Sequence, residues 1–384
     1  MLRSTVMRVA LVHDWLTGVR GGEKCLEVFC ELFPEGEIYT LVYDPNVVSP
    51  TIKRMRITAS WINRLPGSPN YFRYLLPLFP CVIENFSLPE YDLVLSSSHC
   101  VAKGIFPHRA LHVSYVHAPM RYVWDRHEDY FRGGASWAQR AGLALCRPYL
   151  QRWDIRSAGR VDRFIANSRN VAEKIENLDG RTAKVIYPPV DVKRFHPADA
   201  PGSYYLIVSA LVPYKRIDIA VDAFNAIKLP LKIAGDGPLR RVLERRAKSN
   251  IEFLGWVDDQ RLAELYAGCT ALIFPGEEDF GIVPLEAQAC GRPVIGFQRG
   301  GLLETVVGLG GVSAQEAPTG LFFADPSPAR LITAVELYQK RSKEFCPDRI
   351  RQHAEKFSRE RFKREIADYV NVCMTEFSSN RVSC

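Results

Sequence analysis

Short apolar runs alternate with amphipathic stretches along the chain. Continuous apolar runs of four to eight residues are typical of strands in a parallel sheet, where both faces are covered. The predicted strands of the first half are residues 7–15, 91–98, 112–119, 163–168 and 183–190. Those of the second half are residues 204–211, 231–237, 251–257, 271–276 and 293–297. The pattern therefore predicts an α/β protein built from doubly wound parallel sheets.

The segments between these strands have helical spacing. Residues 23–33 place four apolar side chains at i, i+3, i+4 and i+7, which is one face of a helix: Leu26, Phe29, Cys30 and Phe33. Residues 359–377 form the last predicted helix.

A Pro- and Gly-containing break at residues 191–203 divides this alternation, and 384 residues suit two domains of roughly 100–200 residues each. We predict an N-terminal Rossmann-like domain over residues 1–195 and a second over residues 196–354. Residues 355–384 form a helical segment that we expect to pack back on the first domain. Ligands of doubly wound sheets bind beyond the carboxyl ends of the strands, so we expect the two domains to face a central cleft.

Composition narrows the function classes only a little. The net charge of +7 permits an anionic ligand or membrane surface without requiring one. The ten cysteines form no CxxC pair and no cluster at zinc spacing, which indicates free thiols in a reducing cytosol. No run of about 18 apolar residues predicts a membrane span, and the N-terminal apolar stretch is too short for a secretory signal. We therefore expect a cytoplasmic location.

The stretch FPGEEDFGIVPLEAQACGRPVIG, residues 274–296, places two acids eight positions apart. Pro284 is predicted at the first position of a helix, which puts Glu286 in its first turn. Glu286 then either stabilises the helix end or binds a ligand. Glu278 lies in the preceding loop and has no capping duty. Helix-end amides bind phosphate, and neighbouring acids can hold hydroxyls, so the stretch suits a sugar attached to a diphosphate.

This stretch resembles the Glu-x7-Glu signature of the retaining GT-B glycosyltransferases of family 4. The matching residues are Glu278, Phe280, Gly281, Glu286 and Ala287. Further matches, in the family's order, are Gly235, Asp236, Gly237 and Pro238 and the segments 291–306 and 319–323. The resemblance extends from about residue 7 to about residue 365 and implies the GT-B fold. It implies that Glu278 and the amides after it contact the donor sugar, and that Glu286 binds the ribose hydroxyls.

GVRGGEK, residues 18–24, lies between the first strand and the first helix. Glycines let a backbone approach a ligand closely, and the helix start adds free amides. A tight strand-to-helix turn is the alternative interpretation, and the spacing is not that of a dinucleotide-binding loop. The resemblance implies that Gly21 and Gly22 face the donor phosphates.

Three polar residues follow strand ends in the first half. His117 precedes Ala-Pro at the end of a strand, where the family has a histidine that reaches towards the reacting sugar. A histidine packed in the core is the alternative. His13 and Asp14, at the end of the first strand, are candidate acceptor-side residues.

SALVPYKRID, residues 209–218, departs from the family pattern, in which an Arg and a Lys clamp the diphosphate. Lys215 is present, but Ala210 occupies the Arg position. Loss of a charge-assisted hydrogen bond to phosphate forfeits roughly 1.5–3 kcal/mol. Arg216 is adjacent, although consecutive side chains usually point apart.

Residues 51–79 interleave basic and aromatic side chains: Lys53, Arg54, Arg56, Arg64 and Arg73 with Trp61, Tyr71, Phe72 and Tyr74. Such a surface suits an anionic membrane or a lipid-diphosphate acceptor. A solvated basic face over ordinary core residues is the alternative. The small net charge and the absence of a nucleic-acid motif argue against nucleic acid as a partner.

The resemblance implies retaining transfer of a sugar from a nucleotide diphosphate to an acceptor hydroxyl. Lys215 and helix-end amides would stabilise the leaving diphosphate, His117 would orient the sugar, and Glu278 would position it without acting as a nucleophile. No D-x-D motif is present, so no metal and no cofactor are expected.

Residues 167–178, 185–195 and 211–224 resemble the bacterial mannosyltransferase branch of O-antigen, capsule and exopolysaccharide assembly. GDP-mannose is therefore the first choice of donor, with UDP-sugars as the alternative. The acceptor implied is a lipid-linked oligosaccharide or polysaccharide at the inner face of the cytoplasmic membrane. Two other hypotheses stay open: a degenerate sugar-nucleotide-binding protein, favoured by Ala210, and a sugar-nucleotide epimerase.

Overall fold

A computed structural model describes residues 7–18, 21–124, 137–198, 202–310 and 317–382. The chain forms two compact units. Unit 1 takes its described residues from 7–124, 137–189 and 360–382, and unit 2 takes them from 190–359. The chain thus leaves unit 1 after Pro189 and returns to it at Glu360.

Unit 1 contains a seven-stranded parallel sheet in the order β3-β2-β1-β4-β5-β6-β7. Its strands are β1 Val9–His13, β2 Glu37–Thr40, β3 Arg56–Ala59, β4 Leu93–Ser98, β5 Leu111–Val116, β6 Arg163–Ala166 and β7 Ala183–Val185. The sequence pattern missed β2 and β3, which have four residues each. In β3, an edge strand, none of the four residues is fully buried, so no continuous apolar run marks it.

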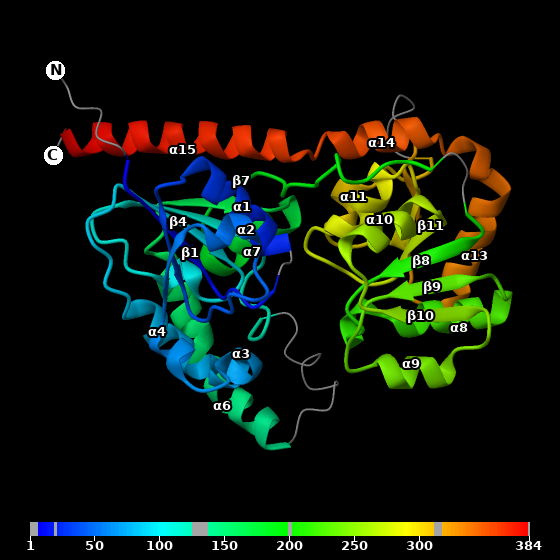
Figure 1. Cartoon of the computed structure of the whole chain (residues 1–384), viewed down its shortest axis with the longest axis horizontal. Helices are drawn as coiled ribbons and strands as arrows, with labels where there is room; N and C mark the ends of the chain where they lie inside the picture. The colour runs from blue at the N-terminus through cyan, green and yellow to red at the C-terminus, as the bar shows by residue number, and fades with distance from the viewer. Residues whose placement is uncertain (1–6, 19–20, 125–136, 199–201, 311–316, 383–384) are drawn as a thin grey trace. The chain divides into compact units, whose positions relative to one another are not determined.

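Both faces of this sheet are covered. Val9 and Leu11 of β1 belong to one apolar cluster, whereas Ala10 and Val12 belong to another, because successive side chains of a strand point to opposite faces. Helix α1 (Gly21–Leu32) covers the first face, and α4 (Phe79–Glu84) and α6 (Trp137–Ala158) cover the second (Figure 1). The other helical elements of unit 1 are α2 Pro50–Lys53, η1 Trp61–Arg64, α3 Ser68–Tyr71, η2 Phe72–Leu78, η3 Ala102–Gly104 and α7 Arg169–Asp179.

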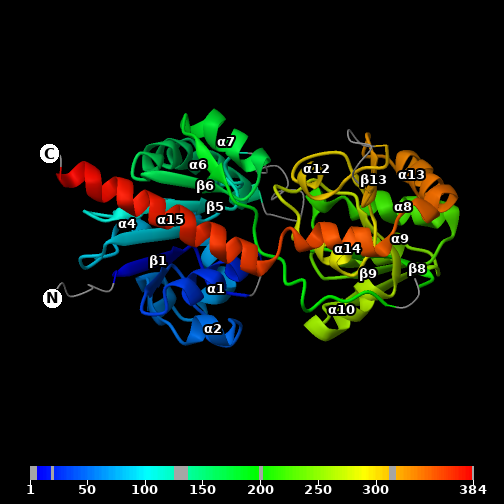
Figure 2. The same cartoon turned by 90° about the horizontal axis from the view of Figure 1, so that it is seen from above.

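The long helix α15 (Arg359–Val382) completes the face that α1 covers. Its buried side chains are Phe362, Ile366, Val370 and Cys373, whose spacing places them on one face of the helix. The Phe362 ring stacks on Phe29 of α1 at 5.9 Å and meets Tyr115 of β5 edge-on at 5.6 Å. Figure 2 shows α15 lying across the strands of this sheet. The last predicted helix is therefore present, and its apolar face is part of the unit 1 core.

Unit 2 contains a six-stranded parallel sheet in the order β10-β9-β8-β11-β12-β13. Its strands are β8 Tyr204–Val208, β9 Leu231–Ala234, β10 Ile251–Gly255, β11 Cys269–Phe274, β12 Val294–Phe297 and β13 Gly320–Phe323. Its helices are η4 Pro213–Lys215, α8 Ile217–Ile227, α9 Arg240–Arg246, α10 Asp259–Ala267, α11 Ile282–Ala289, α12 Leu302–Thr305, α13 Pro328–Arg341, η5 Ser342–Glu344 and α14 Pro347–Glu355. Two doubly wound parallel sheets, as the sequence predicted, are confirmed.

None of the helices in the described ranges is long and apolar enough to cross a membrane.

Candidate functional site

The predicted site residues form two groups, one in each unit, and each group lies at the carboxyl ends of parallel strands. In unit 1, His13 ends β1, Asp14 follows it, and His117 follows β5. Gly21 and Gly22 begin α1 in the same unit. The unit 2 group is Lys215, Gly235, Asp236, Gly237, Glu278, Phe280, Gly281 and Glu286.

Gly22 lies directly against the two histidines of unit 1. A Cβ at residue 22 would lie 3.4 Å from His13 Cε1 and 3.6 Å from His117 Nε2. Any larger side chain there would occupy the space that the two rings face. The predicted trio of Gly22, His13 and His117 is therefore brought together by the fold.

Ser97 of β4, which the sequence did not single out, joins the two histidines. Its hydroxyl is 3.0 Å from His13 Nδ1 and 2.8 Å from His117 Nε2. His13 Nε2 is buried and has no hydrogen-bond partner among the residues that the structure describes. Burial lowers the pKa of His13, and burial together with His99 and His13 lowers the pKa of His117 well below its usual value. Both rings are therefore neutral at pH 7.

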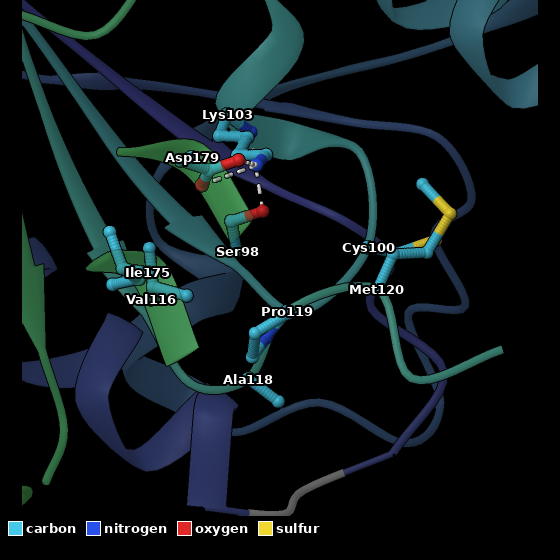
Figure 3. Close-up of a pocket in the computed structure, with 9 residues that line it drawn as sticks. All are labelled: Ser98, Cys100, Lys103, Val116, Ala118, Pro119, Met120, Ile175 and Asp179. Atoms are coloured by element: carbon cyan, nitrogen blue, oxygen red, sulfur yellow. Dashed lines mark hydrogen bonds and ion pairs between the residues drawn. The ribbon is translucent and has the colours of Figure 1, made fainter. Parts of the chain in front are cut away.

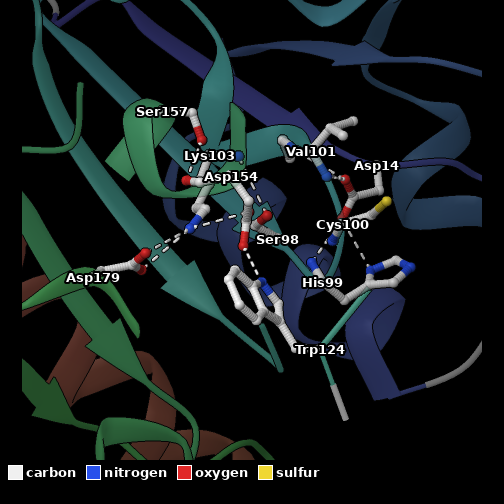
Figure 4. Close-up of polar contacts among 11 residues, drawn as sticks. Asp14, Ser98, His99, Cys100, Val101, Lys103, Trp124, Asp154, Ser157 and Asp179 are labelled. Atoms are coloured by element: carbon white, nitrogen blue, oxygen red, sulfur yellow. Dashed lines mark hydrogen bonds and ion pairs between the residues drawn. The ribbon is translucent and has the colours of Figure 1, made fainter. Parts of the chain in front are cut away.

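The Asp14 carboxylate is hydrogen-bonded to the backbone of unit 1. Its carboxylate accepts the backbone N–H groups of four successive residues, at 2.6–3.0 Å: His99, Cys100, Val101 and Ala102. The His99 ring lies 3.0 Å from the same carboxylate (Figure 4). Burial by itself raises the pKa of Asp14, but His99 and these hydrogen bonds outweigh it and lower the pKa. The arrangement fixes the loop after β4 to the end of β1.

Lys103 forms a second buried polar centre beneath the strand end that carries His117. Its ammonium lies 3.2 Å from Asp154 of α6 and 3.1 Å from Asp179 of α7, and Asp154 also accepts the Trp124 indole N–H at 2.8 Å (Figure 4). Burial lowers the pKa of Lys103, but the two carboxylates outweigh burial and raise it, so the lysine is charged. Breaking one partner of such a buried pair costs about 3–5 kcal/mol. The centre joins α6 and α7 to η3.

A small cavity adjoins this centre. Its lining includes Lys103, Asp179 and Ser98 together with Ala118 and Pro119, the two residues after His117 (Figure 3). A cavity of about 10 Å³ has room for roughly one water molecule. This cavity is too small for a substrate. We interpret the residues that line it as structural support for the loop after His117.

In unit 2, Lys215 and Glu278 form an ion pair. Lys215 ends η4, and Glu278 lies in the loop between β11 and α11. Glycines bring the surrounding loops close: a Cβ at Gly276 would lie 2.8 Å from the Lys215 Cα, and one at Gly300 would lie 2.3 Å from the Glu278 carbonyl oxygen. The Gly301 N–H donates to the same carbonyl at 2.8 Å. The three loops therefore fix the positions of the cation and the carboxylate.

The helix after Glu278 begins two residues earlier than predicted. Helix α11 starts at Ile282, with Gly281 before it at φ 86°, so Pro284 is its third residue and not its first. Glu286 consequently lies in the second turn, where it cannot stabilise the helix start. Gly281 adopts a left-handed backbone conformation, which glycine tolerates, and the helix begins at the next residue, two positions before Pro284. The predicted position of Pro284 and the first-turn placement of Glu286 were wrong.

Glu286 is held from within the core. It is 4% exposed, and its carboxylate accepts the hydroxyl of the fully buried Tyr266 of α10 at 2.9 Å. Burial, followed by the charge of Glu286, raises the pKa of Tyr266 well above its usual value, so the phenol keeps its proton. Tyr266 is a second site residue that the sequence analysis missed. Phe280, 3% exposed, packs near Phe357 with ring centroids 6.1 Å apart.

The Gly235–Gly237 turn after β9 rests on the chain that follows β8. A Cβ at Gly235 (φ 131°) would lie 1.9 Å from the Ser209 carbonyl oxygen, and one at Gly237 would lie 2.5 Å from that of Leu211. Asp236 is exposed enough for a ligand, and its carboxylate accepts the Gly237 N–H at 2.7 Å. Ala210, which replaces the arginine of the family pattern, is exposed beside this turn. Arg216 instead pairs with Asp218 at 3.3 Å.

The basic and aromatic stretch 51–79 divides between core and surface. Phe72 is fully buried, and Arg56 on β3 pairs with Glu37 at 3.4 Å. The exposed members are Lys53, Arg54, Arg56, Trp61, Arg64, Arg73 and Tyr74. The described residues contain no group of three or more His, Cys, Asp or Glu side chains arranged to hold a metal ion.

Two protein families match the chain. The family described as Glycosyltransferase Family 4 matches residues 30–194, and the family described as Glycosyl transferases group 1 matches residues 202–338.

Curated relatives match part of the chain. An uncharacterized glycosyltransferase of Methanocaldococcus jannaschii is 35% identical over 162 residues, which are 40% of this chain and 46% of that protein. The GDP-mannose-dependent alpha-(1-6)-phosphatidylinositol dimannoside mannosyltransferase of Mycobacterium tuberculosis is 29% identical over 48% of this chain and 54% of its own. The O-antigen chain mannosyltransferase C of Escherichia coli is 28% identical over 42% and 47%. The chain therefore spans about half the length of the curated relatives it matches.

Solved structures match almost the whole chain. Sucrose-phosphate synthase from Thermosynechococcus elongatus has a TM-score of 0.73 at 17% identity and covers 96% of this chain and 100% of its own. Anabaena HepE in complex with UDP and glucose has a TM-score of 0.69 at 17% identity, with 95% and 100% covered. At these identities the likeness concerns the fold. The chain therefore has the GT-B fold, and a glycosyltransferase family model matches each of its two halves.

Proposed function

We propose that this protein is a retaining glycosyltransferase that moves a sugar from a nucleotide diphosphate donor to an acceptor hydroxyl. The observation that carries the proposal is the fixed pair of Lys215 and Glu278 at the strand ends of unit 2. A cation and a carboxylate held together in this way match the two halves of a nucleotide sugar. The cation suits the diphosphate, and the carboxylate suits the sugar hydroxyls.

The reaction breaks the bond between the anomeric carbon and the diphosphate oxygen. Negative charge develops on that oxygen, and Lys215 stabilises it where it forms. Binding therefore requires Lys215 to turn part of its hydrogen bonding from Glu278 to phosphate. Glu278 is then free to accept sugar hydroxyls, and Glu286, held by Tyr266, accepts those of the ribose. The acceptor hydroxyl attacks from the face that the diphosphate leaves, and the departing phosphate takes its proton.

In unit 1 we assign Gly21 and Gly22 to the donor phosphates and His117 to the reacting sugar. A glycine that lies against both histidines leaves the space that such a ligand needs. His13 is the acceptor-side candidate, since its Nε2 has no hydrogen-bond partner within the described part of the chain. We assign Asp14 a structural role and no direct ligand contact, because its carboxylate accepts hydrogen bonds from backbone N–H groups.

GDP-mannose is the donor we propose first, and UDP-sugars are the alternative. Two of the relatives are named as mannosyltransferases, one of them GDP-mannose-dependent and the other acting on an O-antigen chain. The acceptor we propose is a lipid-linked oligosaccharide or polysaccharide at the inner face of the cytoplasmic membrane. The exposed basic and aromatic residues of 51–79 would place the protein on that surface. We propose that neither a metal nor a cofactor is needed.

Incubation of the purified protein with radiolabelled GDP-mannose, UDP-glucose or UDP-galactose and bacterial membrane extract tests the proposal. We expect transfer of label to the lipid fraction from GDP-mannose, unchanged by EDTA. The variants Lys215→Ala, Glu278→Ala and His117→Ala should each lose most of it. If no nucleotide sugar is turned over while nucleotides still bind, the transferase proposal fails.

Ala210 favours a second candidate, a sugar-nucleotide-binding protein with weak or no turnover. The position is exposed at the carboxyl end of β8, where an arginine side chain has room. In that case the native chain binds nucleotide without turnover, and Ala210→Arg creates activity. If Ala210→Arg changes an already active enzyme by less than a few fold, the second candidate is excluded.

A further inference from the structure

The hydroxyl of Ser97 lies between two neutral histidines. Ser97 is fully buried on β4, 3.0 Å from His13 Nδ1 and 2.8 Å from His117 Nε2. A serine hydroxyl has one hydrogen, and a neutral imidazole has one N–H and one bare nitrogen. Ser97 can therefore donate to only one of the two rings. From the other ring it then accepts an N–H, or it accepts an N–H from both rings, because its oxygen has two lone pairs.

Two arrangements of protons keep both hydrogen bonds and also give the serine hydrogen an acceptor. In the first, His117 Nε2–H donates to Ser97, and Ser97 donates to His13 Nδ1, so that His13 carries its proton on Nε2. In the second, His13 Nδ1–H donates to Ser97, and Ser97 donates to His117 Nε2, so that His117 carries its proton on Nδ1. If both rings donate to Ser97, its hydroxyl hydrogen has no acceptor among the contacts of the described residues, and if neither ring donates, one of the two bonds is lost. Each such loss costs about 1–3 kcal/mol.

The neighbouring pair Ser96 and His112 shows what an uncoupled arrangement looks like. Ser96 points to the opposite face of β4, and its hydroxyl is 2.9 Å from His112 Nε2. His112 Nδ1 lies 2.9 Å from the Arg160 carbonyl oxygen. A carbonyl can only accept, so His112 has its proton on Nδ1 whatever Ser96 does. His117 has no carbonyl that fixes its ring in this way among the contacts of the described residues.

We propose that Ser97 is a positioning residue that couples the proton positions of His13 and His117. The nitrogen that His117 presents to a ligand is then set by the nitrogen that is protonated on His13. This inference rests on the proposed function for its effect on turnover. The coupling of the two tautomers itself does not depend on the proposed function.

The coupling also connects two parts of a bound ligand. His13 Nε2 is buried and finds no partner in the described ranges, and both rings lie against Gly22. A ligand acceptor that meets His13 Nε2 selects the first arrangement, and His117 then presents a bare Nδ1. A ligand donor at His13 Nε2 selects the second arrangement, and His117 then presents Nδ1–H. Occupation of one ring thus determines whether the other ring can accept or donate.

Nitrogen-15 NMR of the full chain with labelled histidine tests the coupling directly, because protonated and bare imidazole nitrogens have well separated shifts. Four variants are compared with the native protein at pH 7.5: Ser97→Ala, Ser97→Thr, His13→Phe and Ser96→Ala. We expect native His117 to show one dominant tautomer. Ser97→Ala and His13→Phe should both move its two nitrogen shifts towards each other, as a mixture of tautomers would. Ser97→Thr, which keeps the hydroxyl, should restore the native pattern.

Ser96→Ala is the matched control, since it removes a buried serine–histidine bond on the same strand. We expect it to leave the His117 shifts in place and His112 protonated on Nδ1. In transfer assays Ser97→Ala should lower kcat up to about tenfold, the range of one hydrogen bond, and Ser97→Thr should recover most of it.

Unchanged His117 shifts in a folded His13→Phe variant would overturn the coupling. If the native protein shows no turnover but the shifts respond as expected, the coupling holds and the proposed function fails.

Discussion

Lys215 and Glu278, 63 positions apart in the chain, form an ion pair in which both side chains are largely buried, 14% and 21% exposed. Each residue was selected from the sequence for a separate role, and the fold brings them into direct contact. The pair keeps a charged lysine and a charged carboxylate oriented before any ligand arrives, which lowers the cost of ordering them on binding.

Replacing Lys215 by Ala should lower kcat/KM for transfer about 10- to 150-fold. The basis is the loss of a charge-assisted hydrogen bond to the leaving phosphate, roughly 1.5–3 kcal/mol. The Lys215→Ala, Glu278→Ala double variant should lose less than the product of the two single effects, because the residues are in contact. Steady-state kinetics with the preferred donor measures both. Arg216→Gln, which alters the adjacent cation paired with Asp218, is the control and should change kcat/KM less than threefold.

Replacing Tyr266 by Phe should destabilise unit 2 by about 1–3 kcal/mol and weaken nucleotide binding. The hydroxyl is the buried partner of Glu286, and without it a carboxylate 4% exposed loses a hydrogen bond. Urea unfolding and calorimetric titration with GDP measure the two effects. Tyr338→Phe is the comparison, since that hydroxyl donates to the Thr270 carbonyl at 3.1 Å and holds no acid. Weakened GDP binding in both variants alike would contradict a specific role for Tyr266.

Gly235→Ala should destabilise unit 2 by more than about 2 kcal/mol. Its φ of 131° strains any side chain, and the new Cβ would lie 1.9 Å from a backbone oxygen. Gly310→Ala is the control, because Gly310 also has a positive φ, 79°, but has no atom within 4 Å of the Cβ position. It should cost about 1 kcal/mol. Denaturant midpoints and slopes of the two variants give the comparison, and equal losses would contradict the close approach.

Unit 1 should lose stability as the pH falls below about 6.5. Burial lowers the pKa of His112 to about 4, and it lowers the pKa values of His13 and His117 as well. A lowered pKa means that the unfolded chain binds protons first, so the stability present above pH 6.5 is lost as the pH falls towards the folded value. His112 alone should contribute a loss of about 2 kcal/mol between pH 7.5 and 5. Urea unfolding of the native protein and His112→Gln at the two pH values checks this, and the variant should show a smaller difference.

Replacing Lys53 and Arg54 by Gln should weaken binding to anionic vesicles about 30-fold, at about 1 kcal/mol for each basic residue. Trp61→Glu and Tyr74→Glu, at positions 48% and 69% exposed, should also release the protein. Co-sedimentation with phosphatidylglycerol vesicles, repeated with neutral vesicles and at high salt, measures the effect. Trp256→Glu, at a 79% exposed position in unit 2, is the control. Equal release by Trp256→Glu would contradict a surface specific to residues 51–79.

Most of the fold could be predicted because long buried strands appear in the sequence as continuous apolar runs. All ten strands predicted from such runs exist. Three strands were not predicted from such runs. β2 and β3 were missed because short strands near a sheet edge, such as Arg56–Ala59, leave no continuous apolar run. β13 was matched only by the resemblance of residues 319–323. The predicted start of α11 was wrong because both proline and glycine are common near helix starts. The helix begins directly after Gly281 and not at Pro284.

The site could be predicted only in part, for a different physical reason. Glu278, Lys215 and His117 stand in short motifs beside turns, where local sequence is informative. Ser97 and Tyr266 act through partners 20 residues away in the chain, and nothing near them distinguishes them from other core residues. The use of Asp14 as an acceptor for the four N–H groups of residues 99–102 likewise depends on a contact across the sheet.

Phe362, Ile366 and Val370 come from the end of the chain, yet they complete the core of the unit that the start of the chain builds. During synthesis on the ribosome, the first sheet therefore emerges without the side chains that finally seal one of its faces. The whole of unit 2 must be translated before α15 is available. A nascent chain of this protein consequently exposes apolar surface for longer than one whose domains close in order, and it becomes a candidate for chaperone protection during that interval.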